Sequence, residues 1–237
     1  MNNKTSFYLG SAAMLLGAGS LLVLAVSVWG FRLGEWPWPK AYQFATWGVW
    51  IAAAGVGATL IGFLNWMRLC QGGLLALLLG LVLSLPVAGL GLAFDVSARM
   101  TPPINDISTD TEDPPVFWFT VTPTDYPAAN AEPQTSAYPQ LKPLEIDISF
   151  EKAFELALAL VEARGWDVLS TDPDESQIEA IATSKLFGFQ DEVAIRVTET
   201  ETGVRIDLRS RSRLGNIDRG ANAKRISDFL TDLKEQT

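Results

Sequence analysis

Charged residues recur at every second position near the end of the chain, in the run Val204-Arg-Ile-Asp-Leu-Arg-Ser-Arg-Ser-Arg, and all of them except Asp207 are arginines. Successive side chains of a β-strand point to opposite faces of a sheet, so this spacing places the arginines together on one face. A row of guanidinium groups can hold a phosphate or a carboxylate through paired hydrogen bonds. We therefore identify a candidate anion-binding strip, which includes one arginine from the preceding predicted strand and consists of Arg196, Arg205, Arg209 and Arg211.

Two other arrangements would occupy the same arginines. The segment before the domain is acidic, and its carboxylates would hold it against the sheet if they paired with the strip. The carboxylates in question are Asp106, Asp110, Glu112 and Asp113. Ordinary solvation of the arginines is the third arrangement. We favour internal pairing, because it also explains why a proline-rich segment would remain docked.

A second candidate site lies where the last predicted strand leads into the last predicted helix. Four polar side chains would gather there: Ser210, Ser212, Asp218 and Asn222. The functional interpretation is a small polar pocket near a helix N-terminus, suited to an anionic group. The alternative, which we favour, is a hydrogen-bonded network in which Asp218 caps the helix and fixes the turn 214–220.

The residue types that are missing limit the chemistry. The chain has no histidine and a single cysteine, Cys70, so it offers no Ser–His or Cys–His nucleophile pair and no intrachain disulfide. Carboxylates remain as an acid and a base, but no spacing singles out a pair. The run 106–113 is rich in oxygen ligands, yet it lacks the glycine and the final glutamate of an EF-hand loop. We expect no metal ion and no cofactor.

The elements that must position these residues fall into two parts. Residues 1–98 hold three apolar runs, at about 7–29, 44–67 and 74–94. Each is long enough to cross a bilayer, for which about 20 apolar residues suffice. No acidic or basic side chain lies deep within a run, whereas transporters and proton relays usually keep one there. This part is predicted to be an anchor whose partner is the lipid bilayer.

Small residues occur at every fourth position along the third run: Gly72, Ala76, Gly80, Ser84 and Ala88. A ridge of small residues lets another helix approach closely. We expect the ridge to pack against the other spans of this chain, and the second run offers the matching row Ala54, Ala58 and Gly62. Docking to another membrane protein, in a complex formed through the third span, is the alternative.

Residues 99–148 form a proline-rich, acidic tether. From residue 100 onward it holds nine of the thirteen prolines, and its eight carboxylates face only Lys142, a net charge of −7. Repeated proline excludes helix and favours extended backbone. The tether is also too apolar for a solvated spacer, so we expect much of it to lie docked on the domain.

Residues 149–237 have the pattern of an α+β domain. Ser149 is a good N-cap for a helix that ends at Gly165. Four strands are predicted at 166–171, 177–184, 192–198 and 204–212, followed by a helix that begins near Asp218. This order predicts a four-stranded antiparallel meander flanked by two helices. Phe187 and Phe189 flank a turn glycine, and we expect them to fold back onto the sheet rather than reach a partner or the bilayer surface.

Three stretches of the chain resemble the domain-of-unknown-function 1499 family. They are Asp106-Ile-Ser-Thr-Asp, Phe187-Gly-Phe-Gln-Asp-Glu-Val and Arg209-Ser-Arg-Ser-Arg-Leu-Gly-Asn-Ile-Asp-Arg-Gly-Ala-Asn-Ala-Lys-Arg-Ile. The resemblance covers about residues 100–235, and the last stretch is its most specific part. Members occur in bacterial envelopes and in plastids, often behind membrane spans or a lipoprotein anchor, which implies an extracytoplasmic setting. The family has no established reaction, ligand or catalytic residue, so the resemblance implies none here.

The sequence thus predicts a membrane-anchored accessory or interaction protein rather than an enzyme. Residues 95–237 carry 14 basic and 26 acidic residues, and this net charge of −12 argues against a nucleic-acid partner. The charges flanking the spans are nearly balanced, but the Trp- and Pro-rich first loop and the resemblance favour a periplasmic or lumenal domain. The alternatives are a carboxylate-dependent hydrolase of an envelope substrate and an anion- or lipid-binding module.

Overall fold

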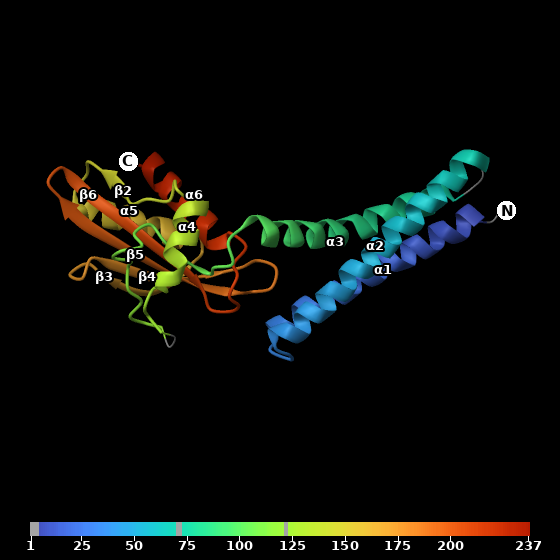
Figure 1. Ribbon diagram of the computed structural model, residues 1–237, viewed down its shortest axis with the longest axis horizontal. Coiled ribbons are helices and arrows are strands. Elements are labelled where there is room, and N and C mark those ends of the chain that lie inside the picture. The colour runs from blue at the N-terminus through green and yellow to red at the C-terminus, as the bar shows by residue number, and fades with distance from the viewer. Residues whose placement is uncertain (1–4, 70–72, 121–122) are drawn as a thin grey trace. The chain divides into compact units, whose positions relative to one another are not determined.

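The computed structural model describes residues 5–69, 73–120 and 123–237 (Figure 1). The chain forms two compact units, Met1–Val96 and Ser97–Thr237. Long apolar helices make up the first unit, and a β-sheet with its own helices makes up the second.

Three helices carry the apolar runs: α1 (Thr5–Arg32), α2 (Trp38–Leu69) and α3 (Leu74–Met100). All three are long and apolar enough to cross a membrane, which confirms the expectation of three spans at the level of length and composition. Each helix extends beyond the run that predicted it, because helical hydrogen bonding continues through the polar and aromatic residues at the ends.

Small residues set the distance between α1 and α3. A methyl group added at Gly10 of α1 would lie 2.9 Å from Cβ of Ala76, and one added at Gly17 would lie 2.9 Å from Oγ of Ser84. Both separations are shorter than carbon and oxygen atoms tolerate, so the glycines are what permits the contact. The two pairs follow the same order along both helices, and α1 and α3 therefore run parallel.

The ridge predicted on the third span thus packs inside the chain. Besides Ala76 and Ser84, Gly80 lies against Ala13, to whose Cβ an added methyl group would come within 2.6 Å. Ala88 is half-buried. Gly72 lies outside the described residues.

The matching row predicted on α2 is wrong in part. Ala54 is exposed, whereas a methyl group at Gly55 would lie 2.4 Å from Oγ of Ser84, and one at Gly62 would lie 2.4 Å from Cδ2 of Leu77. A helix has 3.6 residues per turn, so a row at strict four-residue spacing turns away from the contact. Gly55 and Gly62, seven residues apart, stay on the contacting face.

The second unit is built on one antiparallel sheet of six strands rather than the four predicted. In chain order they are β1 (Asp106–Ser108), β2 (Leu144–Ile146), β3 (Asp167–Asp172), β4 (Gln177–Thr183), β5 (Gln190–Thr200) and β6 (Gly203–Ser212). The spatial order is β1-β6-β5-β4-β3, with β2 also paired to β6. β3 to β6 form the predicted meander.

Both additional strands come from the tether and pair with the otherwise free edge of β6. Ile107 of β1 lies opposite Ser210, and Glu145 of β2 lies opposite Arg205. Each strand has three residues, too few for an alternating pattern to appear in the sequence. Pairing with β6, rather than local preference, makes these segments strands.

Two helices, α5 (Phe150–Ala163) and α6 (Ala221–Glu235), cover one face of the sheet (Figure 1). Ser149 is the N-cap of α5, since its Oγ accepts the Lys152 N–H at 3.3 Å, as predicted. Gly165, with φ of 67°, follows the C-terminal end of the helix in a conformation that favours glycine. Fully buried side chains from both layers meet in the core, among them Val161, Ile178, Ile195, Ile206, Ile226 and Phe229.

The expectation that repeated proline excludes helix from the tether is wrong. A 3-10 turn (Ala128–Asn130) leads directly into the short helix α4 (Ala131–Ala137). Pro133 fits because it lies in the first turn, where a backbone N–H has no partner within the helix. Gln134 then reaches β1: its Nε2 donates to the carbonyl oxygen of Ser108 at 2.6 Å, and its Oε1 accepts the Ser108 N–H at 2.9 Å.

Because α1 contacts α3 closely, the same substitution should have very different effects on the stability of the anchor at two glycines of α1. Gly17→Leu should destabilise the anchor by about 1–3 kcal/mol, the usual cost of overpacking. Gly19→Leu is the matched control, because nothing lies within 4 Å of its added Cβ. The midpoint temperature for loss of monodisperse full-length protein in detergent would be measured by gel filtration. Equal decreases for the two variants would contradict the packing described.

Candidate functional site: a charged sheet face under a proline-rich roof

The sheet face opposite α5 and α6 carries charged side chains. Alternate apolar residues of β6 belong to the core against the helices, so the residues between them project from the other face. The pairing register of β4 and β5 places further side chains of these strands on the same face. We call this set the charged face; it consists of Gln177, Glu179, Glu192, Arg196, Arg205, Asp207, Arg209 and Arg211.

The tether covers the charged face. Residues 109–120, Pro123 and Thr124, which we call the roof, bind it through backbone and side-chain atoms. Phe117 is 1% exposed, and its ring centroid lies 4.7 Å from Cζ of both Arg209 and Arg211. Contacts of a guanidinium group with an aromatic ring contribute about 0.5–2 kcal/mol each, more when water is excluded. Phe117 therefore closes the centre of the face to solvent.

Arg209 is the most buried cation of the strip, with 1% exposure. Its Nε and Nη2 donate to the two carboxylate oxygens of Asp106 at 2.9 and 2.8 Å. Its Nη1 donates to the backbone carbonyl oxygens of Pro115 and Thr124, at 3.1 and 2.9 Å. One side chain of β6 thus ties down the start of the tether and two places in the roof.

Arg211 and Arg213 share one buried carboxylate. Arg211 donates from Nε and Nη2 to Oε2 of Glu192, at 3.0 and 2.5 Å, while Arg213 donates from Nε to Oε1 at 2.9 Å. The Thr120 hydroxyl also donates to Glu192, and Arg211 donates to the carbonyl oxygen of Pro123. Burial alone raises the pKa of Glu192, but these hydrogen bonds outweigh it and hold the pKa below the ordinary value.

Arg205 and Arg196 bind the roof near the rim of the face. Arg205 donates to Asp110 at 2.5 Å and to Asp207 at 3.0 Å. Arg196 donates to Asp113 at 3.0 Å and to Asp207 at 3.3 Å. The Asp113 side chain is 81% exposed, so its ion pair is weak, whereas Asp207 is 1% exposed and lies between two cations.

The four strip arginines therefore contact carboxylates of their own chain. Asp106, Asp110 and Asp113 each bind a different arginine, while Glu112 contributes only its backbone N–H, to Asp110 at 2.9 Å. The carboxylates of 106–113 are pulled apart rather than brought together around a common ion. Across the described residues, no cluster of His, Cys, Asp or Glu has an arrangement that could hold a metal ion.

A buried glutamate fixes the middle of the roof. Glu179 of β4 is 2% exposed, and its carboxylate accepts the backbone N–H groups of Trp118 at 2.7 Å and Phe119 at 3.2 Å. Gln177 donates from Nε2 to Glu179 at 2.9 Å and to the carbonyl oxygen of Val116 at 2.7 Å. Three consecutive peptide units of the roof are thus held by two side chains of one strand.

Sequence reasoning missed the acidic partners on the sheet. Glu179 and Glu192 lie on predicted strands, and both alternate with residues of the apolar core. No local signal in the sequence distinguishes a solvated carboxylate from one that accepts peptide N–H groups. These groups are buried because the tether, which is 60 or more residues away in the sequence, lies over them.

The four residues of the candidate polar pocket lie together. The Ser210 hydroxyl donates to Oδ1 of Asn222 at 2.9 Å, and Nδ2 of Asn222 donates to Oγ of Ser212 at 3.0 Å. Oδ2 of Asp218 accepts the Asn222 backbone N–H at 2.9 Å. Nδ2 of Asn222 also donates to the carbonyl oxygen of Asn105 at 2.9 Å, so this cluster too binds the tether.

Two charged residues that the sequence did not single out complete the cluster. Arg225 donates to Oγ of Ser210 at 2.8 Å and to Oδ2 of Asp191 at 2.5 Å. Ser210 and Asn222 are fully buried. The donors and acceptors of the Asn222 amide are all used within the chain, so the cluster has the form of a hydrogen-bonded network.

Asp218 does not cap the last helix in the predicted way. The N-cap is Gly220, with φ of 80°, and α6 begins at Ala221. Asp218 lies two residues earlier, where its Oδ1 accepts the Gly220 N–H at 2.8 Å and fixes the turn. Burial raises the pKa of Asp218 above its ordinary value, although the hydrogen bonds from Gly220 and Asn222 counteract part of the rise.

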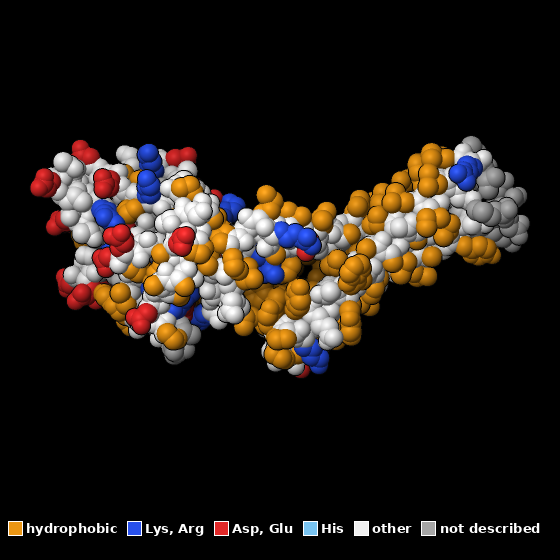
Figure 2. All heavy atoms as spheres, in the orientation of Figure 1, with side chains coloured by type: hydrophobic (Ala, Val, Ile, Leu, Met, Phe, Trp, Pro, Cys, Tyr) orange, Lys and Arg blue, Asp and Glu red, His pale blue; other side chains and the backbone are white. Residues whose placement is uncertain are grey.

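An open depression of about 440 Å³ lies at the other end of the sheet, beside β2 and the β5–β6 turn. It is lined by the carboxylate residues Glu145, Asp147 and Glu201, together with two threonines. Figure 2 shows acidic side chains gathered at the left end of the sheet-containing unit. Glu145 lies opposite Arg205 at the edge of the charged face, and all three carboxylates lie apart from the polar network.

The buried pair of Arg209 and Asp106 predicts a large, partner-dependent loss of stability. Arg209→Met should cost about 3–5 kcal/mol, since it leaves a buried carboxylate without its cation. Combining it with Asp106→Leu should recover most of that loss. Hydrogen exchange of the 203–212 amides in full-length protein would measure both.

Arg196→Met provides the matched control for that experiment. Its roof partner Asp113 is exposed and Asp207 keeps Arg205, so the expected loss is about 1 kcal/mol or less. Equal losses for the Arg196 and Arg209 variants would contradict the central role assigned to the buried pair.

Glu192 predicts a specific loss of stability in acid. Its pKa is lowered in the folded state, so the stabilisation is present above the ordinary glutamate pKa, about 4.3, and disappears as the pH falls through the folded pKa. Glu192→Gln should therefore reduce the slope of unfolding free energy against pH between roughly pH 5 and pH 3. The control Glu201→Gln removes a carboxylate from an exposed turn. Unchanged slopes for Glu192→Gln, measured by denaturant titration, would rule this contribution out.

Comparison with known proteins agrees with the extent of this architecture. No curated protein matched the chain. A family model described as "Protein of unknown function (DUF1499)" matches residues 106–233, which runs from the first residue of β1 to the last buried turn of α6. This is more than half of the 237 residues. The chain therefore belongs to the DUF1499 family, here behind three apolar helices.

Proposed function

We propose that this chain is a membrane-anchored accessory protein that presents the roof of its α+β unit to a protein partner on the extracytoplasmic side. The observation that carries the proposal is a group of exposed, rigidly held apolar side chains in the roof. Val116, Trp118 and Phe119 are 44%, 45% and 57% exposed.

The backbone that carries these side chains is fixed from below. Glu179 accepts the N–H groups of Trp118 and Phe119, and Gln177 binds the carbonyl oxygen of Val116. Phe117, between them, points inward onto the arginines. Neighbouring residues of the roof therefore have different roles. The ring of Phe117 covers the charged face, while the side chains on either side of it remain exposed to solvent.

Rigidly held aromatic residues are the usual centres of protein–protein interfaces. Trp and Tyr supply a large contact area, and they dominate the binding free energy measured by alanine substitution. A surface that is already ordered loses less conformational entropy on binding. Burying a carboxylate is costly unless its hydrogen bonds are satisfied, so the use of Glu179 to hold two amides favours a defined outer surface.

Two other functions have less support. A carboxylate-dependent hydrolase needs one carboxyl group that can hold a proton beside an ionised one, whereas Glu192 lies between Arg211 and Arg213, and its hydrogen bonds hold its pKa below the ordinary value. An anion-binding strip needs accessible arginines, and Arg209 is covered by the roof. Three apolar helices are consistent with an anchor, and the Trp- and Pro-rich first loop, together with the family resemblance, favours the extracytoplasmic side.

A photo-crosslinking amino acid placed at Phe119 in the full-length protein, in its native membrane, tests the proposal. We expect a single adduct of defined mass, and we expect Trp118→Ala to reduce its yield roughly 30-fold, the effect of about 2 kcal/mol at a central contact. The matched control is the same amino acid at Val168, a comparably exposed position on β3.

Adducts of equal yield at 119 and 168, or no adduct at 119, would refute a specific partner at the roof. Hydrogen exchange of the 203–212 amides should be the same in the Trp118→Ala variant, which shows that the sheet remains folded.

A further inference from the structure

One end of the sheet brings together three connections that are distant in the sequence. We call it the entry end; it comprises residues 101–105, 184–190 and 212–220. The Ser212 N–H donates to the carbonyl oxygen of Asn105 at 2.9 Å, and the Asp218 N–H donates to that of Ile104 at 3.1 Å. Arg213 donates to Gln190 through both backbone and side chain, at 3.3 and 3.0 Å.

The entry end exposes apolar side chains. Leu186, Leu214 and Ile217 are 43%, 43% and 37% exposed. Phe187 and Phe189 are half-buried, and their rings stack with centroids 5.4 Å apart. These two rings, which we expect to fold back onto the sheet, therefore pack on each other within the turn.

The charge of the entry end is opposite to that of the rest of the unit. Its basic residues are Lys185, Arg213 and Arg219, of which Arg213 pairs with Glu192 of β5. The carboxylate within these ranges, Asp218, accepts backbone N–H groups inside the turn. Residues 97–237 as a whole carry 14 basic and 25 acidic residues, a net charge of −11. A net positive, apolar surface is therefore concentrated in one place on an acidic unit.

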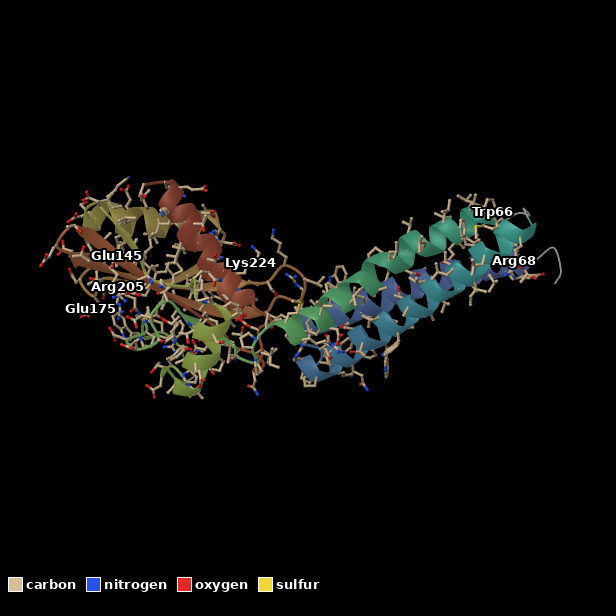
Figure 3. All side chains as sticks on the ribbon, turned by 45° about the horizontal axis from the view of Figure 1, so that its top comes forward. Trp66, Arg68, Glu145, Glu175, Arg205 and Lys224 are labelled. Atoms are coloured by element: carbon tan, nitrogen blue, oxygen red, sulfur yellow. The ribbon has the colours of Figure 1, made fainter. Side chains whose placement is uncertain are left out.

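The opposite end of the strands is acidic. The β3–β4 and β5–β6 turns, with the strand ends beside them, carry Asp172, Asp174, Glu175, Glu199 and Glu201. In Figure 3, Glu145 and Glu175 lie toward one end of the unit and Lys224, in the first turns of α6, lies toward the other. The strands thus run between a negative and a positive pole.

The chain enters the unit at the positive pole. α3 ends at Met100, and Thr101 already lies against Gly220, whose added Cβ would be 3.2 Å from Thr101 Cγ2. The five residues from Met100 to Asn105 can reach at most about 17 Å, even when fully extended. A helix able to span a membrane therefore leads directly into this end of the sheet.

Surfaces that lie in the headgroup layer of a bilayer typically combine exposed apolar side chains with basic side chains. The apolar groups are buried about 5–10 Å deep, at the boundary of headgroups and acyl chains, and Lys and Arg are attracted to lipid phosphates. We propose that the entry end is a phospholipid-contact site, where Leu186, Leu214 and Ile217 insert between headgroups and the basic side chains bind phosphate. This goes beyond the proposed roof partner and does not depend on it.

The occupant is the bilayer rather than a second copy of the chain. Two copies that met through their entry ends would bring like charges together, because the acidic residues lie at the opposite pole. A bilayer, in contrast, is next to residue 101, because the helix that precedes this residue is able to span a membrane. Contact at this end would fix the orientation of the sheet and leave the roof free for a partner.

Depth-dependent fluorescence quenching tests the proposal in full-length protein reconstituted into vesicles of phosphatidylcholine with phosphatidylglycerol. A bimane probe is attached at Leu214→Cys in a Cys70→Ser background, so that it labels a single thiol. We expect lipids brominated near the headgroup to quench it, and iodide to quench it roughly fivefold less than a probe at Glu201→Cys. The second position is the control at the acidic pole.

Adding Leu186→Glu and Ile217→Glu should abolish the lipid quenching at 214 and restore access of iodide, while exchange of the 203–212 amides stays unchanged. Equal iodide access at 214 and 201 in the parent protein would overturn the proposal. Protection from iodide without quenching by brominated lipid would overturn it as well, since the surface would then be covered by a second copy of the chain or by another part of the same chain. The vesicles contain no other protein, so neither result bears on the roof partner.

Discussion

A guanidinium group in a protein interior requires an opposite charge and an acceptor for almost every N–H it carries. Arg209 meets this requirement with atoms from three places in the chain, namely the carboxylate of Asp106 and the carbonyl oxygens of Pro115 and Thr124. None of these groups belongs to the meander of β3 to β6. The meander therefore cannot satisfy its own central side chain, and the proline-rich segment is needed to complete the fold.

β6 accordingly organises both layers of the unit. Its apolar residues face α5 and α6, and its arginines face the roof, while its free edge accepts β1 and β2. The family match begins at Asp106, the partner of Arg209, and not at the first helix of the α+β pattern. Family members are thus alike over a segment that includes the roof, which agrees with its role in completing the sheet.

The parts of the fold that have a period in the sequence were predictable. Three apolar helices, the N-cap at Ser149 and four strands follow from hydropathy, capping preference and alternation. β1, β2 and α4 have no such signal, because three-residue strands and a seven-residue helix depend on partners elsewhere. Pairing of tether carboxylates with arginines was inferable from charge, since the tether from residue 100 onward holds eight carboxylates and a single cation, Lys142.

The candidate site was less predictable, because the role of a polar side chain depends on whether it is buried. Glu179 has the alternation of a solvated strand residue, yet it accepts the N–H groups of Trp118 and Phe119. Asp218 has the spacing of an N-cap but lies two residues before the N-cap Gly220, and Arg219 and Gly220 both adopt positive φ. Such choices depend on where the tether and the turn lie in space, and one-dimensional patterns do not carry that information.

The distance along the chain between Asp106 and Arg209 also orders the events of folding. The two residues are 103 positions apart, and contacts of such separation form late, because a long loop must be closed before they form. β1 is the first strand to be synthesised, yet its neighbour in the sheet is the last. Until β6 has formed, the arginines and the roof remain exposed to water. The charged face can therefore be covered by the roof only after the final strand has been synthesised. During synthesis, the three apolar helices of this protein are therefore complete long before the sheet-containing unit can fold.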